Sequence, residues 1–373
     1  MFHYDDGLFL TRASLAVDVR RRQPRSFVSH AHTDHIARHE LALATPTTAK
    51  LYKHRLGPHH RVLEMQYGQP IEFGNLRLTA LPAGHCLGSA MLLADDGHQT
   101  LLYTGDFKLG ESATAEPATL PHADVLVMES TFGLPKYRLP PRDETIARLL
   151  EIVTDAIAHD VTPVIHAYPL GKSQEVTKIL TTAGIPVLQH RAIYEISRIY
   201  EACGMPLGNY GLYTGNPRPS ATAGSTTACG LAPQQHPPNE SEIRKEFTRR
   251  GGKSKIPTAL APPRAAPGLS LPKSAVITLP RGMNDFRLAN LGRTVSIACT
   301  GWAVDERTKY RWGVDHALPL SDHADYDQLL ETVRRVDARE IYCTHGPVEF
   351  VDLLRDLGYN AFPLAPRAQK MLF

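Results

Sequence analysis

The chain has 373 residues, 42% of them hydrophobic and 21% charged, and 41 Lys and Arg against 38 Asp and Glu give a formal net charge of +3. This composition fits one large or two ordinary globular domains and excludes a chain that is disordered throughout. No apolar run approaches the roughly 20 residues of a membrane span. The first residues also lack the pattern of a signal peptide, so we expect a cytoplasmic protein with no membrane partner.

Histidine is the unusual feature of the composition, with 18 residues against five cysteines. The cysteines are widely spaced and include no C-x-x-C pair, which argues against a disulfide scaffold or a thiolate zinc finger. Because the net charge is small, a polyanionic partner would need a local basic surface. Specific chemistry is therefore expected where the histidines cluster.

The first cluster follows a short predicted strand near the N-terminus. His30 and His32 are two residues apart, and in extended backbone such side chains project to the same side, where both can bind one ion. Asp34 and His35 follow, and they point toward a second ion where residues 36–39 are predicted to begin a helix. Imidazole and carboxylate ligands without thiolate suit zinc, which we expect, or manganese.

Further ligand types follow the next predicted strands. The strand over 76–81 leads to His85, whose flanking glycines allow the backbone to approach a metal closely. The strand that begins at residue 100 ends in a Gly-Asp turn at Asp106, a suitable bridge between two ions. Asp18, at the end of an early strand, is expected to hold a ligand imidazole from behind.

This series of residues resembles the metallo-β-lactamase fold hydrolases. The resemblance implies an α/β fold, an αββα sandwich with two metals at one edge of its sheets. It also implies that three histidines bind one metal, two residues bind the other and one carboxylate is shared. In that order these residues are His30, His32 and His85, then Asp34 and His35, then Asp106.

Three later positions narrow the resemblance. Glu129, His323 and His345 look like the three extra motifs of the β-CASP nucleases, in which a cap domain is inserted into the lactamase fold. Residues 129–138 and 168–174, together with the motif around Ser321, resemble the bacterial ligase-associated DNA exonucleases. That branch implies DNA repair beside an ATP-dependent DNA ligase and a helicase.

A histidine at the last of these motifs usually accompanies RNA substrates in eukaryotic relatives, and this chain has His345 there. An RNA-processing nuclease of the same architecture is therefore the alternative function. A non-catalytic scaffold is disfavoured because every ligand position is filled. A lactamase or thioesterase would not need the cap or the Glu129–His323 pair.

The chemistry of phosphodiester hydrolysis fits these residues. Two metals about 3.5–4 Å apart can generate hydroxide near neutral pH and stabilise the transition state. The leaving oxygen then needs a proton, and His323 is the expected general acid, its pKa raised by Glu129. The predicted catalytic residues are His323, Glu129, Asp34 and Asp106. His345 is expected to complete the second metal site, and Ser321 to support the ligands from outside.

The cap is expected to hold a phosphate. The predicted strand over 161–168 is followed by Lys172, Ser173 and Gln174 at the start of an apparent helix, where amides and the helix dipole favour an anion. An ordinary strand–turn–helix is the alternative interpretation. Other candidates for contact with nucleic acid are Lys136 and Tyr137, followed by Lys108, Arg138 and Phe132.

The expected division places the lactamase domain at 1–136 and 305–373 and the cap at 137–304. Helices are predicted over 143–159, 195–202, 327–336 and 348–357. A Pro-, Ser-, Thr- and Gly-rich insertion at 216–272 is interpreted as a flexible segment with a basic arm that touches nucleic acid. Deletion of 236–256 should then weaken DNA binding in a salt-dependent way without changing metal content, and an unchanged salt slope would exclude the idea.

Overall fold

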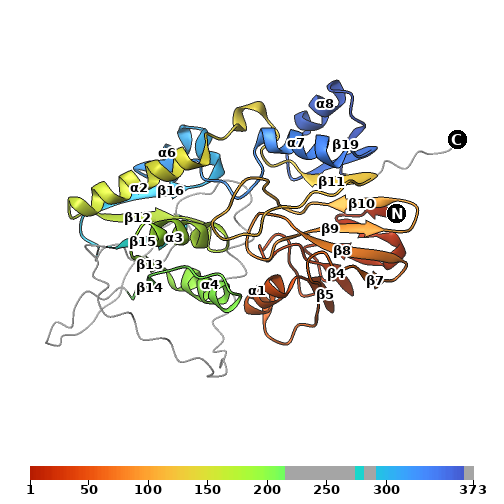
Figure 1. Cartoon of the computed structure of the whole chain (residues 1–373), viewed down its shortest axis with the longest axis horizontal. Coiled ribbons are helices and arrows are strands. Elements are labelled where there is room, and N and C mark those ends of the chain that lie inside the picture. Colours follow the sequence, from red (N-terminus) through yellow and green to blue (C-terminus); the bar gives the residue numbers. More distant parts are fainter. Residues whose placement is uncertain (215–273, 281–290, 365–373) are drawn as a thin grey trace, which may run out of the picture. The chain divides into compact units, whose positions relative to one another are not determined.

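A computed structural model describes residues 1–214, 274–280 and 291–364 of the chain (Figure 1). The predicted insertion at 216–272 and the segment 236–256 lie outside these residues. Within the described part, the strands form three sheets. No helix there has both the length and the apolar character required to cross a membrane.

The first sheet has six short strands in the order β1-β2-β3-β4-β5-β6, parallel from β3 onward. Its strands are β1 (Phe2–Tyr4), β2 (Leu8–Leu10), β3 (Leu15–Val17), β4 (Arg25–Phe27), β5 (Leu41–Ala44) and β6 (Val62–Glu64). The helical segments beside them are the 3-10 turn η1 (Thr11–Ala13) and α1 (Pro46–Leu56). Helix α1 begins with Pro46 at its first position, behind a Thr45 side chain that accepts the amide of Thr48.

The second sheet runs β19-β18-β11-β10-β9-β8-β7, and its strands β10, β11, β18 and β19 are parallel. Its strands are β7 (Ile71–Phe73), β8 (Leu76–Pro82), β9 (Ala90–Asp95), β10 (Thr100–Tyr103), β11 (Val125–Glu129), β18 (Glu340–Thr344) and β19 (Ala361–Pro363). The helical segments around this sheet are η2 (Pro135–Tyr137), α7 (Tyr326–Val336) and α8 (Val348–Asp356).

Buried side chains show that these two sheets are stacked between helices. Phe27 of the first sheet and Leu92 of the second belong to one core. Val333 of α7 and Phe350 of α8 pack on the outer face of the second sheet, and Tyr52 of α1 packs on the first. Figure 1 shows α1 and the pair α7 and α8 on opposite sides of the stack. The predicted αββα sandwich is therefore confirmed.

The third sheet is entirely parallel, in the order β14-β13-β15-β12-β16-β17. Its strands are β12 (Thr162–His166), β13 (Val187–Gln189), β14 (Tyr210–Leu212), β15 (Ala275–Thr278), β16 (Thr294–Cys299) and β17 (His316–Leu318). The helical segments that accompany it are α2 (Arg142–Ala158), α3 (Lys172–Thr182), α4 (Arg191–Ala202), η5 (Gly301–Val304) and α6 (Arg307–Trp312). All five residues of β12 are buried, as expected for a central strand covered on both faces.

Two details differ from the predictions. Strand β17 extends the third sheet to Leu318. If the lactamase domain resumed at residue 305, β17 would be assigned to a different domain from the rest of its sheet, so the topology favours a domain boundary after Leu318. The helix predicted from residue 36 is absent, since only a turn at residues 33–35 is present. The hydroxyl of Tyr52 donates to the carbonyl of Ala37 (2.5 Å) and accepts the amide of His39 (3.2 Å), so these backbone groups are satisfied outside a helix.

Candidate metal centre and active site

The predicted ligands come together because their strands end at the same edge of the sandwich. His30 and His32 follow β4, and His85 follows β8. Asp106 follows β10, and His345 follows β18. Strands β10, β11 and β18 are parallel neighbours, so their carboxyl ends lie side by side. Residues that are far apart in the sequence thus form one compact group of side chains.

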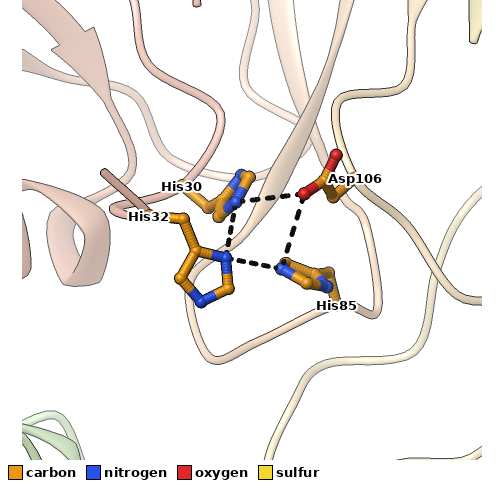
Figure 2. A group of neighbouring side chains, drawn as sticks. All are labelled: His30, His32, His85 and Asp106. Carbon is orange, nitrogen blue, oxygen red and sulfur yellow. Dashed lines mark hydrogen bonds and ion pairs between the residues drawn. The ribbon is translucent and has the colours of Figure 1, made fainter. Parts of the chain in front are cut away.

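Four of these side chains form the group drawn in Figure 2. His32 Nδ1 lies 2.9 Å from His30 Nε2 and 3.0 Å from His85 Nε2. Asp106 Oδ2 closes the ring, 3.5 Å from His30 Nε2 and 3.9 Å from His85 Nε2. The side chains of His30 and His85 are fully buried, and Asp106 is nearly so. The donor atoms face one another, as ligands around a cation do.

A second group lies on the other side of Asp106. Its members His35, Asp106 and His345 offer ligand atoms that all lie within 4.8 Å of one another. His35 Nε2 is 3.4 Å from Asp106 Oδ2, and His345 Nδ1 is 3.9 Å from Asp106 Oδ1. The exposed carboxylate of Asp34 falls outside this group but lies 3.9 Å from His35 Nε2. Asp106 is therefore shared by both groups.

Four of the imidazoles are held through their outer nitrogens. His35 Nδ1 donates to Asp18 Oδ2 (2.9 Å) and His85 Nδ1 to the carbonyl of Asp322 (2.8 Å). His32 Nε2 donates to the carbonyl of Leu170 (3.1 Å), and His30 Nδ1 lies 2.9 Å from Ser29 Oγ. Such outer contacts fix the tautomer and orientation of metal-binding histidines.

This arrangement provides a test of whether a cation fits. Because the outer nitrogens carry the protons, the inner nitrogens of neutral rings present lone pairs, and in the first group His32 Nδ1 lies about 3 Å from the inner nitrogens of both His30 and His85. Lone pairs at this separation repel unless a cation lies among them. In addition, His35 Nε2 is buried and, apart from its ion-pair contact with Asp106 Oδ2 at 3.4 Å, has no hydrogen-bond partner. The residues present therefore fit divalent ions with nitrogen and oxygen ligands.

The electrostatics of the two groups differ. Burial lowers the pKa of His85 to about 3, with repulsion from His323 as a second cause, and burial also lowers the pKa of His30. Both rings are thus neutral, the form that binds metal. For His35, burial is outweighed by Asp106 and Asp18, which raise its pKa well above the usual value. This position favours a positive charge, which a bound ion would provide.

Asp18 organises the rear of the second group. It follows β3 with a left-handed backbone (φ 49°), and its carboxylate accepts from the amide of Ser29 (2.8 Å), Ser29 Oγ (2.5 Å), His35 (2.9 Å) and Tyr103 (2.9 Å). Asp18 was predicted to hold a ligand imidazole from behind, and the imidazole that it contacts is that of His35. Ser29 and Tyr103 were not predicted. Only the position of Ser29 directly before His30 could have indicated it.

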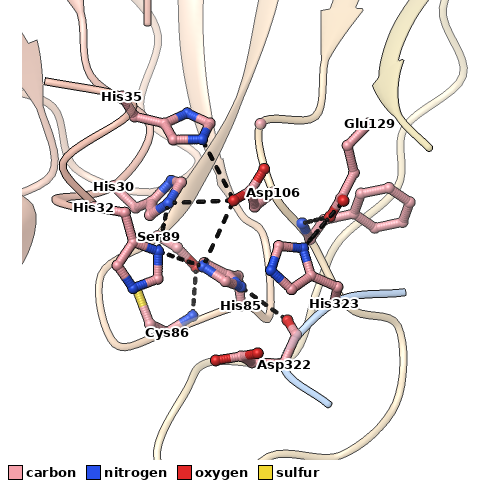
Figure 3. Close-up of polar contacts among 12 residues, drawn as sticks. His30, His32, His35, His85, Cys86, Ser89, Asp106, Glu129, Asp322 and His323 are labelled. Carbon is pink, nitrogen blue, oxygen red and sulfur yellow. Dashed lines mark hydrogen bonds and ion pairs between the residues drawn. The ribbon is translucent and has the colours of Figure 1, made fainter. Parts of the chain in front are cut away.

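Glu129 and His323 form a pair beside the first group, as Figure 3 shows. His323 Nδ1 lies 3.0 Å from both oxygens of Glu129, which also accepts from the amide of Phe107 (2.8 Å) and from Thr131 Oγ1 (2.5 Å). Although burial alone would lower it, Glu129 and Asp106 raise the pKa of His323 to about 10. Ser321 Oγ accepts the His323 amide (2.9 Å) and so fixes the loop.

The structure contradicts the predicted phosphate site at the start of α3. The side chains of Lys172, Ser173 and Gln174 are buried. Ser173 Oγ donates to the carbonyl of Tyr168 (2.7 Å), and Gln174 Oε1 accepts the amide of Gly171 (2.9 Å). The amides of Lys172 and Ser173 are bonded within the same loop. Neither these side chains nor these amides are available to a phosphate.

Lys172 instead joins a buried ionic cluster. Its Nζ lies 3.0 Å from Glu175 and 3.7 Å from the carboxylate of Asp322, whose carbonyl holds His85. Lys108 is buried in the same cluster, 4.0 Å from Glu175. It is therefore not on the surface, where a contact with nucleic acid was predicted. The cluster is therefore linked to the metal centre through Asp322.

Of the other predicted nucleic-acid contacts, only some are accessible. Lys136 is exposed and its Nζ lies 5.0 Å from the ring centre of the half-buried Tyr137. Arg138 is exposed but paired with Asp327 at 3.0 Å. Phe132 is 2% exposed, so it cannot stack directly on a base.

Comparison with known proteins gives a consistent set of relatives. No family model matches the chain. A probable DNA ligase of Opitutus terrae is 34% identical over 367 residues, which are 97% of this chain and 31% of that protein. The 5′ exonuclease Apollo of Gallus gallus is 31% identical over 183 residues, 47% of this chain and 40% of Apollo. Cleavage and polyadenylation specificity factor subunit 3 of Dictyostelium discoideum is 32% identical over 157 residues, 41% of this chain and 20% of that subunit.

These relatives are longer than the region that they share with this chain, which spans about a third of the Opitutus protein. Among solved structures, a protein of unknown function from Enterococcus faecalis V583 has a TM-score of 0.51. It is 14% identical and the match covers 86% of this chain and 75% of that protein. At this sequence identity, the likeness to the Enterococcus protein concerns the fold alone.

Proposed function

Since this chain belongs to the β-CASP nucleases of the metallo-β-lactamase fold, we propose that it is a metal-dependent exonuclease that shortens DNA during repair. The convergence of imidazole and carboxylate ligands on Asp106 carries the proposal. Two bound divalent ions, zinc or manganese, would supply an activated water and neutralise charge on the phosphodiester. The residues of the chain hold these ions, position the substrate and transfer protons.

We assign the ligands as the two groups suggest. His30, His32, His85 and Asp106 hold one ion. His35, His345 and the shared Asp106 hold the other, with Asp34 beside them. Although burial alone would raise it, the pKa of Asp106 is held well below the usual value by His35 and His323, so this carboxylate is ionised at neutral pH.

His323 acts as the proton donor to the leaving oxygen. With a pKa near 10 it is protonated at neutral pH, and Glu129 holds its Nδ1 so that Nε2 carries the transferable proton. Glu129 is buried and accepts two further hydrogen bonds, so it stays in place during the reaction. Ser321 keeps the backbone of His323 in position.

DNA is the preferred substrate because a segment of a probable DNA ligase resembles nearly the whole chain. The same likeness supports an association with an ATP-dependent ligase and, through the ligase-associated branch, with a helicase. RNA processing remains the alternative function, favoured by His345 and by relatives named as endoribonucleases.

The test is digestion of end-labelled single-stranded and duplex DNA, with matched RNA, in added zinc or manganese. We expect progressive shortening of DNA from one end that a chelator abolishes. Asp106→Asn, which keeps the shape of the bridging side chain, should be inactive. Cleavage of RNA alone would favour the alternative, and cleavage of neither substrate would overturn the nuclease proposal.

A further inference from the structure

An open pocket of about 530 Å³ lies against the metal centre. Tyr137, Trp302 and Leu134 give it an apolar wall, and His345 lines the side toward the metal groups. Trp302 is 39% exposed, although tryptophan is usually more deeply buried. Sequence reasoning did not single out this residue, since one tryptophan in a short 3-10 turn leaves no periodic signal.

The pocket borders both halves of the reaction site. His345, which lines it, lies with His35 and Asp106 in the second ligand group. Thr131, which also lines it, donates to Glu129 of the proton-donor pair. A group bound in the pocket would therefore be a direct neighbour of a phosphodiester at the metal centre.

The aromatic side chains of the wall pack closely against one another. The ring of Trp302 meets Phe132 at 4.8 Å and Tyr137 at 5.4 Å, both edge to face. Phe132 is buried beneath them and lies 6.2 Å from the His323 ring. Gly301 allows this packing, because a Cβ there would lie 2.6 Å from Phe132. The Trp302 carbonyl also accepts from Thr308 Oγ1 at 2.7 Å.

We propose that this pocket binds a nucleobase of the substrate, stacked on Trp302, with the adjoining phosphodiester at the metal centre. This inference rests on the proposed nuclease function. Stacking on an aromatic side chain accepts any base, because every base has a π-face. The exposed Lys136 does not line the pocket, but its Nζ lies 5.0 Å from the ring centre of the lining residue Tyr137, where it adds a positive charge for the backbone phosphates. The volume is ample for one base and its sugar.

The test measures binding of a labelled single-stranded DNA oligonucleotide by fluorescence anisotropy with the full chain. Trp302→Ala should weaken binding about 5- to 150-fold, the range for loss of one stacked base. Trp302→Phe should retain most of the affinity. Tyr310→Ala is the matched control, since Tyr310 is an aromatic residue of α6 that is 76% exposed and does not line the pocket. It should bind as the wild type does.

A second arm removes the base rather than the side chain. Abasic analogues are placed at each of the terminal nucleotides in turn. One position should weaken wild-type binding by a similar factor and should cause no further loss in Trp302→Ala. Equal affinity of Trp302→Ala and wild type, or an abasic penalty that persists in the variant, would overturn the pocket. Cleavage without dependence on Trp302 would overturn the pocket alone, whereas binding through Trp302 without cleavage would overturn only the nuclease proposal.

Discussion

The buried carboxylate of Glu175 lies among three cations, and its replacement by glutamine should destabilise the protein. Glu175 accepts from Arg142 at 2.6 Å and from Lys172 at 3.0 Å, and Lys108 is 4.0 Å away. Its side chain is 3% exposed. Glutamine has nearly the same shape but no charge, so the substitution removes the ionic partner of all three groups without leaving a cavity.

The expected magnitude follows from proton affinity. Although burial would raise it, the three cations, Lys172 foremost, lower the pKa of Glu175 from 4.5 to about 2. At about 1.4 kcal/mol for each tenfold change in proton affinity, this corresponds to about 3 kcal/mol of stability. Removing one partner of a buried ion pair costs about 3–5 kcal/mol, which agrees.

The contribution of Glu175 to stability depends on pH. Because the pKa of Glu175 is lower in the folded state, its contribution is fully present above pH 4.5 and is lost as pH falls toward 2. Urea unfolding of wild type and Glu175→Gln should therefore differ most at neutral pH, and the difference should narrow in acid. Glu151→Gln, on the exposed face of α2 where Glu151 pairs with Arg148, is the matched control and should change stability by less than about 0.5 kcal/mol. Equal midpoints for wild type and Glu175→Gln at pH 7 would refute the reasoning.

Three substitutions at the metal centre separate the roles assigned there. His323→Ala should reduce cleavage at least about 100-fold with metal content unchanged by elemental analysis, because general acid catalysis contributes about 10²–10⁴ in rate; normal cleavage would exclude its role as proton donor. Asp34→Ala should lose cleavage together with the second ion, and full metal stoichiometry would exclude Asp34 as a ligand. Asp18→Ala frees His35 Nδ1 and should weaken metal affinity about 10- to 100-fold in competition with a chromogenic chelator; unchanged affinity would show that the ring does not need this support.

The metal-ligand pattern could be predicted because each ligand follows a recognisable strand. His30 and His32 share a side of extended backbone, and Asp106 ends a buried strand, so the local sequence already places them at a sheet edge. The absent helix after His35 shows the limit of such reasoning. Tyr52, 15 residues later, bonds the backbone at Ala37 and replaces the helical hydrogen bonds.

The error at α3 has a similar cause. Glycine, lysine and serine at a helix start are typical of an anion site, and the sequence does not reveal which partners already occupy them. Lys172 is neutralised by Glu175 within its own helix and by Asp322, 150 residues away. The contacts from Leu170 and Asp322 to the ligand imidazoles are made by main-chain carbonyls, which no residue type indicates.

Those two carbonyls have a thermodynamic consequence. Leu170 lies between β12 and α3, and Asp322 follows β17, so the rings of His32 and His85 are oriented by segments next to the third sheet. Any displacement of these segments would release two imidazoles and lower the affinity for the ion. Linkage is reciprocal, so ion binding must strengthen the attachment of these segments by the same free energy. Metal occupancy should therefore slow amide hydrogen exchange at the start of α3, far along the chain from the first ligand.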